Sequence, residues 1–453
     1  MAKTPPRRRR GLENPPLPSQ LAAVNLNAAA IDVGATMLHV AIPPDRDPQP
    51  VRTFSTFTYD LENLANWLEE KGIDTVVMES TGNFWIPVFE LLTARGFETL
   101  LTDPYRLKTV PGRKSDIKDC QWMQQLHTYG LLSGAFRPPE QVLRLRTYMR
   151  LRARHVAAAA RQIVAMQDAL TLMNIKLQHA VNDLSGVTGM AIIRAILAGE
   201  RNPQQLATLR DPHCKNSVQT IAHALEGTWQ EQYLFELRQA VDSYDHYRSQ
   251  IGECDAAIDQ VLEEFEAKAD PADLPPLKKT QKRDRKDRPG TTREDLYRIC
   301  GVDVMSCDGI KDNTALVLVS EIGMDVTPWP TEKRFASWLG ICPANDISGG
   351  KVIRRRKRRT TNRAAQALRL AASNLHHSQS SLGAYFRRKR AQIGVQKAIE
   401  ATAHKLARIW YQMMKNKTPY TDIGEEAYNE RYRAHRLAVC AHMAKALGMR
   451  LVW

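Results

Sequence analysis

The chain has 453 residues, enough for roughly two to four domains with cores of their own. Lysine and arginine number 64 against 49 acids, and the net charge of +15 indicates a polyanionic partner, either nucleic acid or an anionic membrane surface. No apolar run reaches the roughly 18 residues of a membrane-spanning helix. The seven cysteines contain no C-x-x-C pair, which argues against a disulfide framework and structural zinc and favours a reducing cytoplasm.

Residues 1–24 form an arginine- and proline-rich segment without the apolar core of a secretory signal. We expect a disordered basic arm or a solubilising tail. Residues 25–135 then alternate strand and helix signals. The runs AAAIDV, MLHVAIP, VRTFSTF, DTVVMES and FETLLTD predict strands, and YDLENLANWLEEKG and FWIPVFELLTARG predict helices. This order predicts a mixed sheet with helices packed on it.

The region 136–266 carries two apolar seams with heptad spacing. Such seams predict long coiled-coil helices, which pack on each other within the chain or on another subunit. The length of the first seam favours partner helices, and hence a dimer or tetramer. Its members are Met149, Val156, Ile163, Leu170 and Leu177, with Ala159, Met166, Met173 and Ala180 three places later. Those of the second are Leu237, Tyr244, Ile251 and Ile258, with Ala240, Tyr247, Cys254 and Val261 three places later.

Residues 267–292 are rich in Pro, Lys, Arg and Asp and nearly devoid of apolar residues, which predicts a linker. The last region, 293–453, has mainly helical patterns. Its most polar stretch, SGGKVIRRRKRRTTNR, carries a dense run of basic residues. Such runs bind phosphates without reading bases.

Four acids stand at the ends of predicted elements. Asp32 ends the first strand, Glu79 ends the strand DTVVMES, and Asp116 and Asp119 share one face of a later helix. Strands are depleted in acids. The placement of Asp32 and Glu79 makes sense if their strands are neighbours and aim both side chains at one site. Four converging carboxylates require a divalent cation, and oxygen ligands suit Mg²⁺ or Mn²⁺. Each acid taken alone is also compatible with a turn or a helix cap.

Four pieces of the chain resemble the DEDD-type insertion-sequence transposases: AIDVG, VVMESTGNFW, TDPYRLKTVPGRKSDIKDCQW and FASWLGICPANDISGGK, in order within residues 28–375. The resemblance implies an α/β plus α protein. An RNase H-like (RuvC-like) mixed-sheet domain precedes the coiled-coil helices and a mainly helical C-terminal transposase domain. It also implies that Asp32, Glu79, Asp116 and Asp119 form a metal-binding tetrad.

The same resemblance implies that Ser348 is a nucleophile, in a motif of Gly340-Ile341-Cys342-Pro343 followed by Ser348-Gly349-Gly350. Serine needs a base or a metal to act near neutral pH, and no histidine lies near it in sequence. Activation by the metal of the acid tetrad therefore fits better than a Ser-His pair. A phosphoserine link conserves the energy of the broken phosphodiester, and the chain has no G-x-x-x-x-G-K-[ST] loop for ATP.

Nucleic-acid contacts are expected from basic residues beside these motifs. Lys311 occupies the second glycine place of a segment that resembles a helix-hairpin-helix element. The full predicted set is Arg113, Lys114, Lys311, Lys351, Arg354, Arg355, Arg356, Lys357, Arg358 and Arg359. Little in the chain would read a DNA sequence. The resemblance implies that a structured noncoding RNA pairs with donor and target DNA and carries the specificity.

The sequence therefore predicts a transposase that cuts and rejoins DNA, guided by RNA. A metal-dependent junction nuclease that hydrolyses DNA, with Ser348 merely structural, is the alternative enzyme. A nucleic-acid-binding protein without catalysis is the third reading.

Overall fold

The computed structural model describes residues 22–79, 82–102, 116–276, 293–343, 345–349, 351–354 and 362–449, without the side chains of 116–118, 346 and 347. It divides into two compact units, Met1–Arg137 and Pro138–Trp453. Each is described by itself. No described helix is long and apolar enough to cross a membrane.

The first unit is built on a five-stranded sheet in the order β3-β2-β1-β4-β5. The strands are β1 Ala28–Val33, β2 Met37–Ala41, β3 Val51–Ser55, β4 Thr75–Glu79 and β5 Glu98–Thr102. The pairs β1–β2 and β2–β3 are antiparallel, whereas β1, β4 and β5 run parallel. The prediction of a mixed sheet is confirmed.

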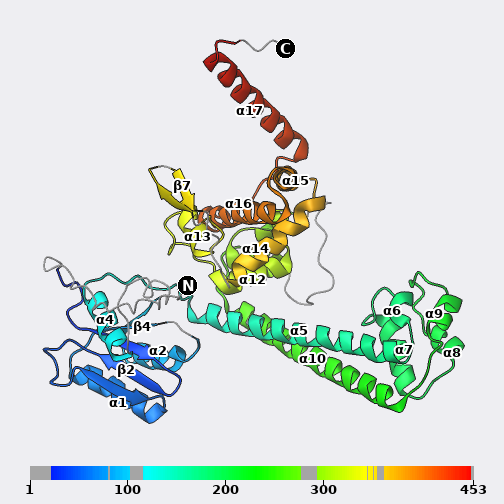
Figure 1. Ribbon diagram of the computed structural model, residues 1–453, viewed down its shortest axis with the longest axis horizontal. Helices are drawn as coiled ribbons and strands as arrows, with labels where there is room; N and C mark the ends of the chain where they lie inside the picture. Colours follow the sequence, from blue (N-terminus) through cyan, green and yellow to red (C-terminus); the bar gives the residue numbers. More distant parts are fainter. Residues whose placement is uncertain are drawn as a thin grey trace, which may run out of the picture. The chain divides into compact units, whose positions relative to one another are not determined.

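Helices cover both faces of this sheet. Helices α1 (Thr58–Glu70) and α2 (Trp85–Ala94) bury Leu64 and Leu92 against one face. Helix α4 (Asp116–Thr128) covers the other face, and α1 and α4 lie on opposite sides of the sheet in Figure 1. Because side chains alternate along a strand, Ile31 and Met78 belong to the α1–α2 core, and Ala30 and Val77 to the α4 core. Both faces of the central strands are therefore buried.

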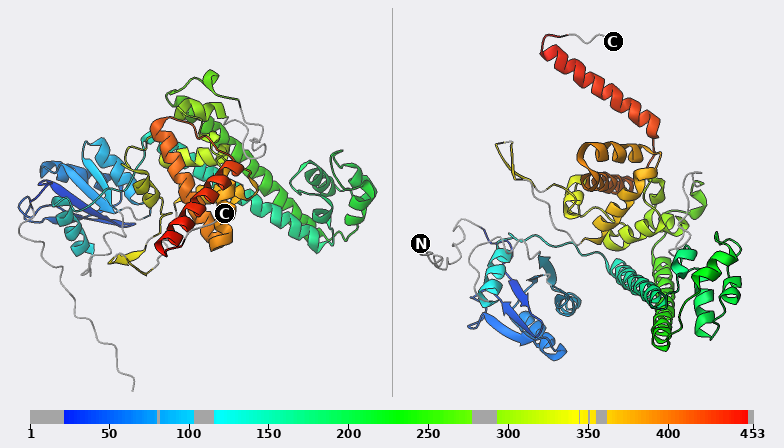
Figure 2. Two further views of the ribbon diagram at one scale, coloured as in Figure 1. Left: turned by 90° about the horizontal axis from the view of Figure 1, so that it is seen from above. Right: turned by 45° about the vertical axis from the view of Figure 1, so that its right-hand side comes forward.

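The second unit begins with the long helices α5 (Glu140–Leu172) and α10 (Glu231–Glu264), which lie side by side (Figures 1 and 2). A buried ion pair joins them, with Arg152 Nε 2.6 Å from an Asp255 carboxylate oxygen. The two predicted seams thus pack on each other within one chain. The first seam is only partly covered, since Met149 and Leu170 are buried and Val156 is 42% exposed.

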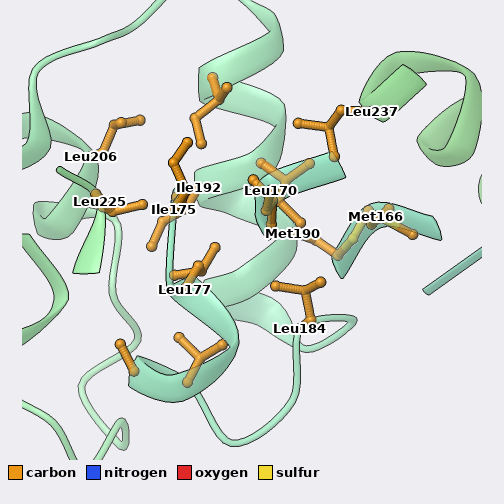
Figure 3. Packing of buried hydrophobic residues seen from close by; sticks show 14 of the residues in the cluster. Met166, Leu170, Ile175, Leu177, Leu184, Met190, Ile192, Leu206, Leu225 and Leu237 are labelled. Carbon is orange, nitrogen blue, oxygen red and sulfur yellow. The ribbon is translucent and has the colours of Figure 1, made fainter. Parts of the chain in front are cut away.

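The first seam is also shorter than the heptad pattern predicts. Helix α5 ends at Leu172, and Asn174 has the left-handed φ of 58° that turns the chain out of the helix. The seam residues Leu177 and Ala180 therefore lie in a separate short helix, α6 (Leu177–Ala180). Helices α7 (Val187–Leu197), α8 (Pro203–Thr208) and α9 (Val218–Ala224) complete a small cluster there. Figure 3 shows its core, which includes Leu170 and Leu237 of the long helices as well as Ile192 and Leu206.

The rest of the second unit is mainly helical, as predicted. Its helices are α11 (Arg293–Cys300), α12 (Asp312–Ile322), α13 (Glu332–Trp338), α14 (Arg363–Asn374), α15 (Ser381–Ile393), α16 (Val395–Asn416) and α17 (Glu425–Ala446). Short 3₁₀ turns span Pro271–Asp273, Val304–Ser306 and Leu375–His377. One hairpin, β6 (Asp346–Ser348) and β7 (Lys351–Arg354), interrupts the helices.

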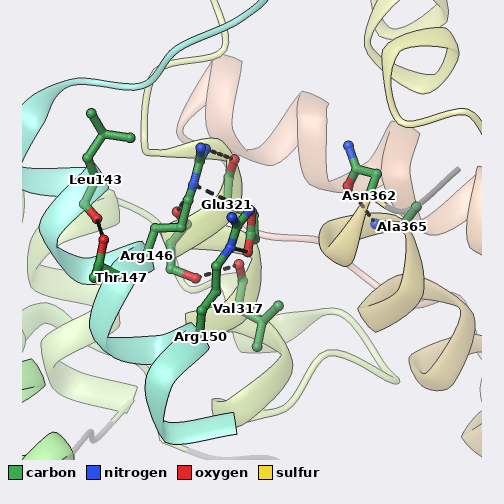
Figure 4. Close-up of polar contacts among 9 residues, drawn as sticks. Leu143, Arg146, Thr147, Arg150, Val317, Glu321, Asn362 and Ala365 are labelled. Atoms are coloured by element: carbon green, nitrogen blue, oxygen red, sulfur yellow. Dashed lines mark hydrogen bonds and ion pairs between the residues drawn. The ribbon is translucent and has the colours of Figure 1, made fainter. Parts of the chain in front are cut away.

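Two arginines of α5 attach this helical cluster to the long helices (Figure 4). Arg146 donates to the backbone carbonyls of Ser320 and Glu321, at 3.2 and 2.7 Å, at the end of α12. Arg150 forms a two-pronged contact with the Glu321 carboxylate, at 2.9 and 2.7 Å. Burial lowers the pKa of Arg146 to about 10, so the guanidinium stays charged near neutral pH. Cations at a helix C-terminus also interact favourably with its dipole.

Candidate active site

Asp32 and Glu79 lie next to each other at the ends of two parallel strands. The register pairs Ile31 of β1 with Met78 of β4, so the following residues of the two strands are neighbours. Ala30 and Val77, two residues earlier, both belong to the core under α4. The period of two along a strand therefore places Asp32 and Glu79 on that same face. The expectation that these two acids come together agrees with this register.

Helix α4, which carries Asp119, packs on the same face of the sheet. The Cys120 thiol donates to the backbone carbonyls of Ala30 and His39, at 3.1 and 3.0 Å, which holds the first turns of α4 against β1 and β2. Burial raises the pKa of Cys120 to about 12, and the charges of Asp32 and Asp119 add to that rise.

Asp116 is the first residue of α4 and precedes Cys120 by four residues, which is about one helical turn. Its side chain lies outside the described residues, as do the predicted DNA contacts Arg113 and Lys114. The predicted helix is therefore present, and it packs on the face of the sheet that carries Asp32 and Glu79.

The donor set fits a hard divalent cation. The acids offer only oxygen, and the neighbouring Cys120, with a pKa of about 12, remains a thiol rather than a thiolate ligand. Among the side chains that the structure describes, no three His, Cys, Asp or Glu residues are spaced to hold a metal ion by themselves. The side chain of Asp116 is not described, so this finding applies to the other three acids and not to the complete tetrad.

The sequence reasoning missed a row of polar residues that continues across the whole sheet. The register places His39 opposite Asp32, Thr53 opposite His39, and Thr102 opposite Glu79. Each lies next to a residue of the α1–α2 core, namely Leu38, Phe54 and Leu101, and so occupies the α4 face. The alternation of polar and apolar residues in MLHVA and VRTFS is the signal that could have found it.

Ser348 lies in the second unit, at the end of β6. It pairs directly with Lys351 of β7 across a connection of two residues. Gly349 has a φ of 56°, the left-handed conformation that tight hairpin turns require. Ser348 is exposed, and so are the four residues Lys351–Arg354. The predicted nucleophile thus lies on an exposed ribbon with a cation directly across from it.

The other predicted basic residues have different outcomes. Lys351 and Arg354 lie on the exposed strand β7. Lys311 precedes α12 in an extended conformation and is exposed, while Gly309, two residues earlier, has a φ of 92°. A tight turn is therefore present even though Lys311 replaces the second glycine. Arg355, Arg356, Lys357, Arg358 and Arg359 lie outside the described residues.

A mixed sheet with helices packed on it is consistent with an RNase H-like DEDD domain. Residues 29–175 match a family model, the DEDD type of IS110 elements, whose description is "Transposase". Residues 303–387 match the "Transposase IS116/IS110/IS902 family". A comparison with curated proteins found no significant match. The first match contains all four acids and the second contains Ser348, so the chain belongs to the DEDD-type insertion-sequence transposases. It is a transposase of a mobile element, and its substrate is DNA.

Proposed function

We propose that this transposase cuts and rejoins DNA through a covalent phosphoserine at Ser348, with a divalent cation held by Asp32, Glu79, Asp116 and Asp119. The observation that carries the proposal is the adjacency of Asp32 and Glu79 on the face of the sheet that α4, the helix of Asp119, covers. Mg²⁺ or Mn²⁺ bound there would neutralise the acids and stabilise charge on the phosphodiester.

The Ser348 hydroxyl attacks the phosphorus of the scissile phosphodiester. The bond from Oγ to phosphorus forms as the bond to the leaving nucleotide oxygen breaks, and the serine proton ends on that leaving oxygen or in solvent. The hydroxyl of a second strand then attacks the phosphoserine, which joins the new strands and returns the serine. No ATP is consumed, because the number of phosphoester bonds stays constant.

The hairpin supports this role for Ser348. Its hydroxyl is exposed on a narrow ribbon, and the cross-strand partner Lys351 can contact the same phosphate. Arg354 adds a further cation on β7. The reaction requires this hydroxyl and the acids to meet on one phosphodiester, within a chain or between two subunits. We keep a dimer or tetramer as the predicted assembly.

For target choice we propose a noncoding guide RNA that pairs with donor and target DNA. The net charge of +15 is suited to binding RNA as well as DNA. The protein would recognise the shape and backbone of the RNA, and base pairing would supply the specificity.

A metal-dependent nuclease that hydrolyses DNA is the second candidate. It is favoured by one observation: the acids occupy a buried, regular framework, which could serve an activated water without Ser348.

The experiment incubates the full chain with element-end or junction DNA, its copurifying RNA and Mg²⁺, and separates the products under denaturing conditions. We expect a protein–DNA adduct that is absent from Ser348→Ala. The matched control is Ser373→Ala, whose hydroxyl donates to the Leu370 carbonyl of its own helix. Equal free cleaved ends from wild type and Ser348→Ala would favour hydrolysis, and binding without any cleavage would contradict both enzymes.

A further inference from the structure

The polar row on the α4 face contains a histidine directly opposite Asp32. In the antiparallel pair of β1 and β2, Asp32 and His39 are register partners. Directly opposite residues point to the same face, with Cβ atoms about 4.5–5.5 Å apart. Leu38 and Val40, on either side of His39, belong to the core under α1 and α2. The imidazole therefore lies on the face that carries Asp32.

Two contacts fix the position of His39. Its backbone carbonyl accepts the thiol hydrogen of Cys120 at 3.0 Å, which ties this point of β2 to α4. Its ring Nδ1 lies 3.2 Å from the hydroxyl of Thr53, the register partner on the outer strand β3. The ring thus contacts Thr53 on the side of β3, and its register neighbour on the side of β1 is Asp32.

The hydroxyl of Thr53 can donate to Nδ1, which places the ring proton on Nε2. That tautomer presents an N–H donor, and the neighbour of His39 on the inner side is the Asp32 carboxylate. A carboxylate that accepts such a bond on one oxygen has its other oxygen directed away from the donor. Residues that orient a ligand in this manner contribute to metal affinity without touching the metal.

We propose that His39 is a positioning residue for Asp32, with Nε2–H donating to the carboxylate and Thr53 setting the tautomer. This inference rests on the proposed function, in which Asp32 binds the divalent cation. A hydrogen bond from Nε2–H would hold the Asp32 carboxylate beside Glu79. The role also accounts for a histidine on a strand face where an apolar residue would otherwise complete the α4 core.

The test measures Mn²⁺ affinity of the full-length protein by calorimetric titration, without DNA. We expect His39→Leu to bind Mn²⁺ about 10–100-fold more weakly. His39→Gln, whose amide NH₂ can replace Nε2–H, should recover most of the affinity, and Thr53→Val should show an intermediate loss. The matched control is Thr99→Val, a strand threonine on the opposite face whose hydroxyl bonds Thr93 at 2.7 Å. Unfolding midpoints should be unchanged, since His39 is half-buried and Thr53 exposed.

The outcomes separate this inference from the metal assignment. If Asp32→Asn loses Mn²⁺ binding but His39→Leu keeps wild-type affinity, or His39→Gln fails to restore it, the positioning role is wrong. If Asp32→Asn itself binds Mn²⁺ normally, the proposed metal site fails, whatever His39 does. Electron spin-echo spectra of bound Mn²⁺ should lack coupling to a directly bound imidazole nitrogen. Such coupling, lost in His39→Leu, would make His39 a ligand and overturn the positioning role.

Discussion

The strand acids Asp32 and Glu79 of the first unit and Ser348 on the β6–β7 hairpin of the second unit are presented in opposite ways. Asp32 is the last residue but one of β1 and Glu79 is the last residue of β4, and the strand residues before them are buried on both faces. Ser348 ends a three-residue strand that pairs with a single exposed strand. Isolated two-stranded ribbons are marginally stable in water. The comparison teaches that the acids are held by the fold itself, whereas the serine depends on its turn and its partners.

The largest expected effect on DNA cleavage comes from replacing one of the two strand acids. Asp32→Asn should lower DNA cleavage at least about a thousandfold, because the carboxylate that would bind the cation becomes a neutral amide. The variant should remain folded. Without metal, loss of one of several neighbouring negative charges should leave the free energy of unfolding unchanged or raise it by up to about 1 kcal/mol.

The measurement pairs adduct formation with urea unfolding of the same preparation. A variant that loses cleavage because it unfolds more easily would show that Asp32 is structural, and the contrast between a rigid acid site and an exposed serine would lose its basis. Asp74→Asn is a useful control, because Asp74 is exposed just before β4, and its carboxylate accepts a bond from Asn27.

A smaller effect should come from the turn of the hairpin. Gly349→Val forces a β-branched residue into the left-handed region, which costs roughly 1–2 kcal/mol, and should lower adduct formation about tenfold. A Cβ at this position would meet nothing within 4 Å among the described residues, so the penalty expected there is one of backbone conformation. Gly349→Asn, which tolerates this conformation, should be much less affected. Equal losses in both variants would point to a contact of Gly349 with DNA rather than to the turn.

The smallest expected effect is a change in stability with pH, and it tests how tightly α4 packs on the sheet. Burial lowers the pKa of His127, on α4, to about 4 from its ordinary 6.5, and Thr75 of β4 lies 3.0 Å from its Nε2. In the unfolded chain the imidazole of His127 binds a proton below about pH 6.5. In the folded protein it binds that proton only below about pH 4. The stability contributed by the neutral ring is therefore present above pH 6.5 and is lost as the pH falls towards 4.

Between pH 7 and pH 5.5 this linkage should remove about 1 kcal/mol of unfolding free energy. Urea unfolding of wild type and His127→Gln at both pH values measures it, because all other titrating groups are common to the two proteins. The variant should lose less stability on acidification than wild type. An identical pH dependence would show that His127 is solvated and that α4 is less tightly packed on the sheet than its contacts indicate.

Local pattern in the sequence was sufficient for most elements near the site. The apolar runs before Asp32 and Glu79 predicted β1 and β4, and the spacing of Asp116 and Asp119 predicted the helix that begins at Asp116. These signals succeed because the period of a strand or a helix is a short-range property. The serine motif likewise contains the glycine that its turn requires.

Such local patterns did not predict which distant segments of the chain pair with each other. That His39 lies opposite Asp32 follows from the register of β1 and β2, and that Thr102 lies opposite Glu79 follows from that of β4 and β5. The two heptad seams likewise did not reveal that their helices pack on each other, nor that α5 ends at Leu172.

By itself, the sequence determined which segments form the strands near the site, which helix follows, and which residue types could bind metal or attack DNA. Only the tertiary structure decided which strands are neighbours and in what register. The physical reason is that parallel strands such as β1 and β4 have no tight turn to fix their register. It is chosen by burying Ala30 and Val77 under α4 and Ile31 and Met78 under α1 and α2, and that choice places Asp32 beside Glu79.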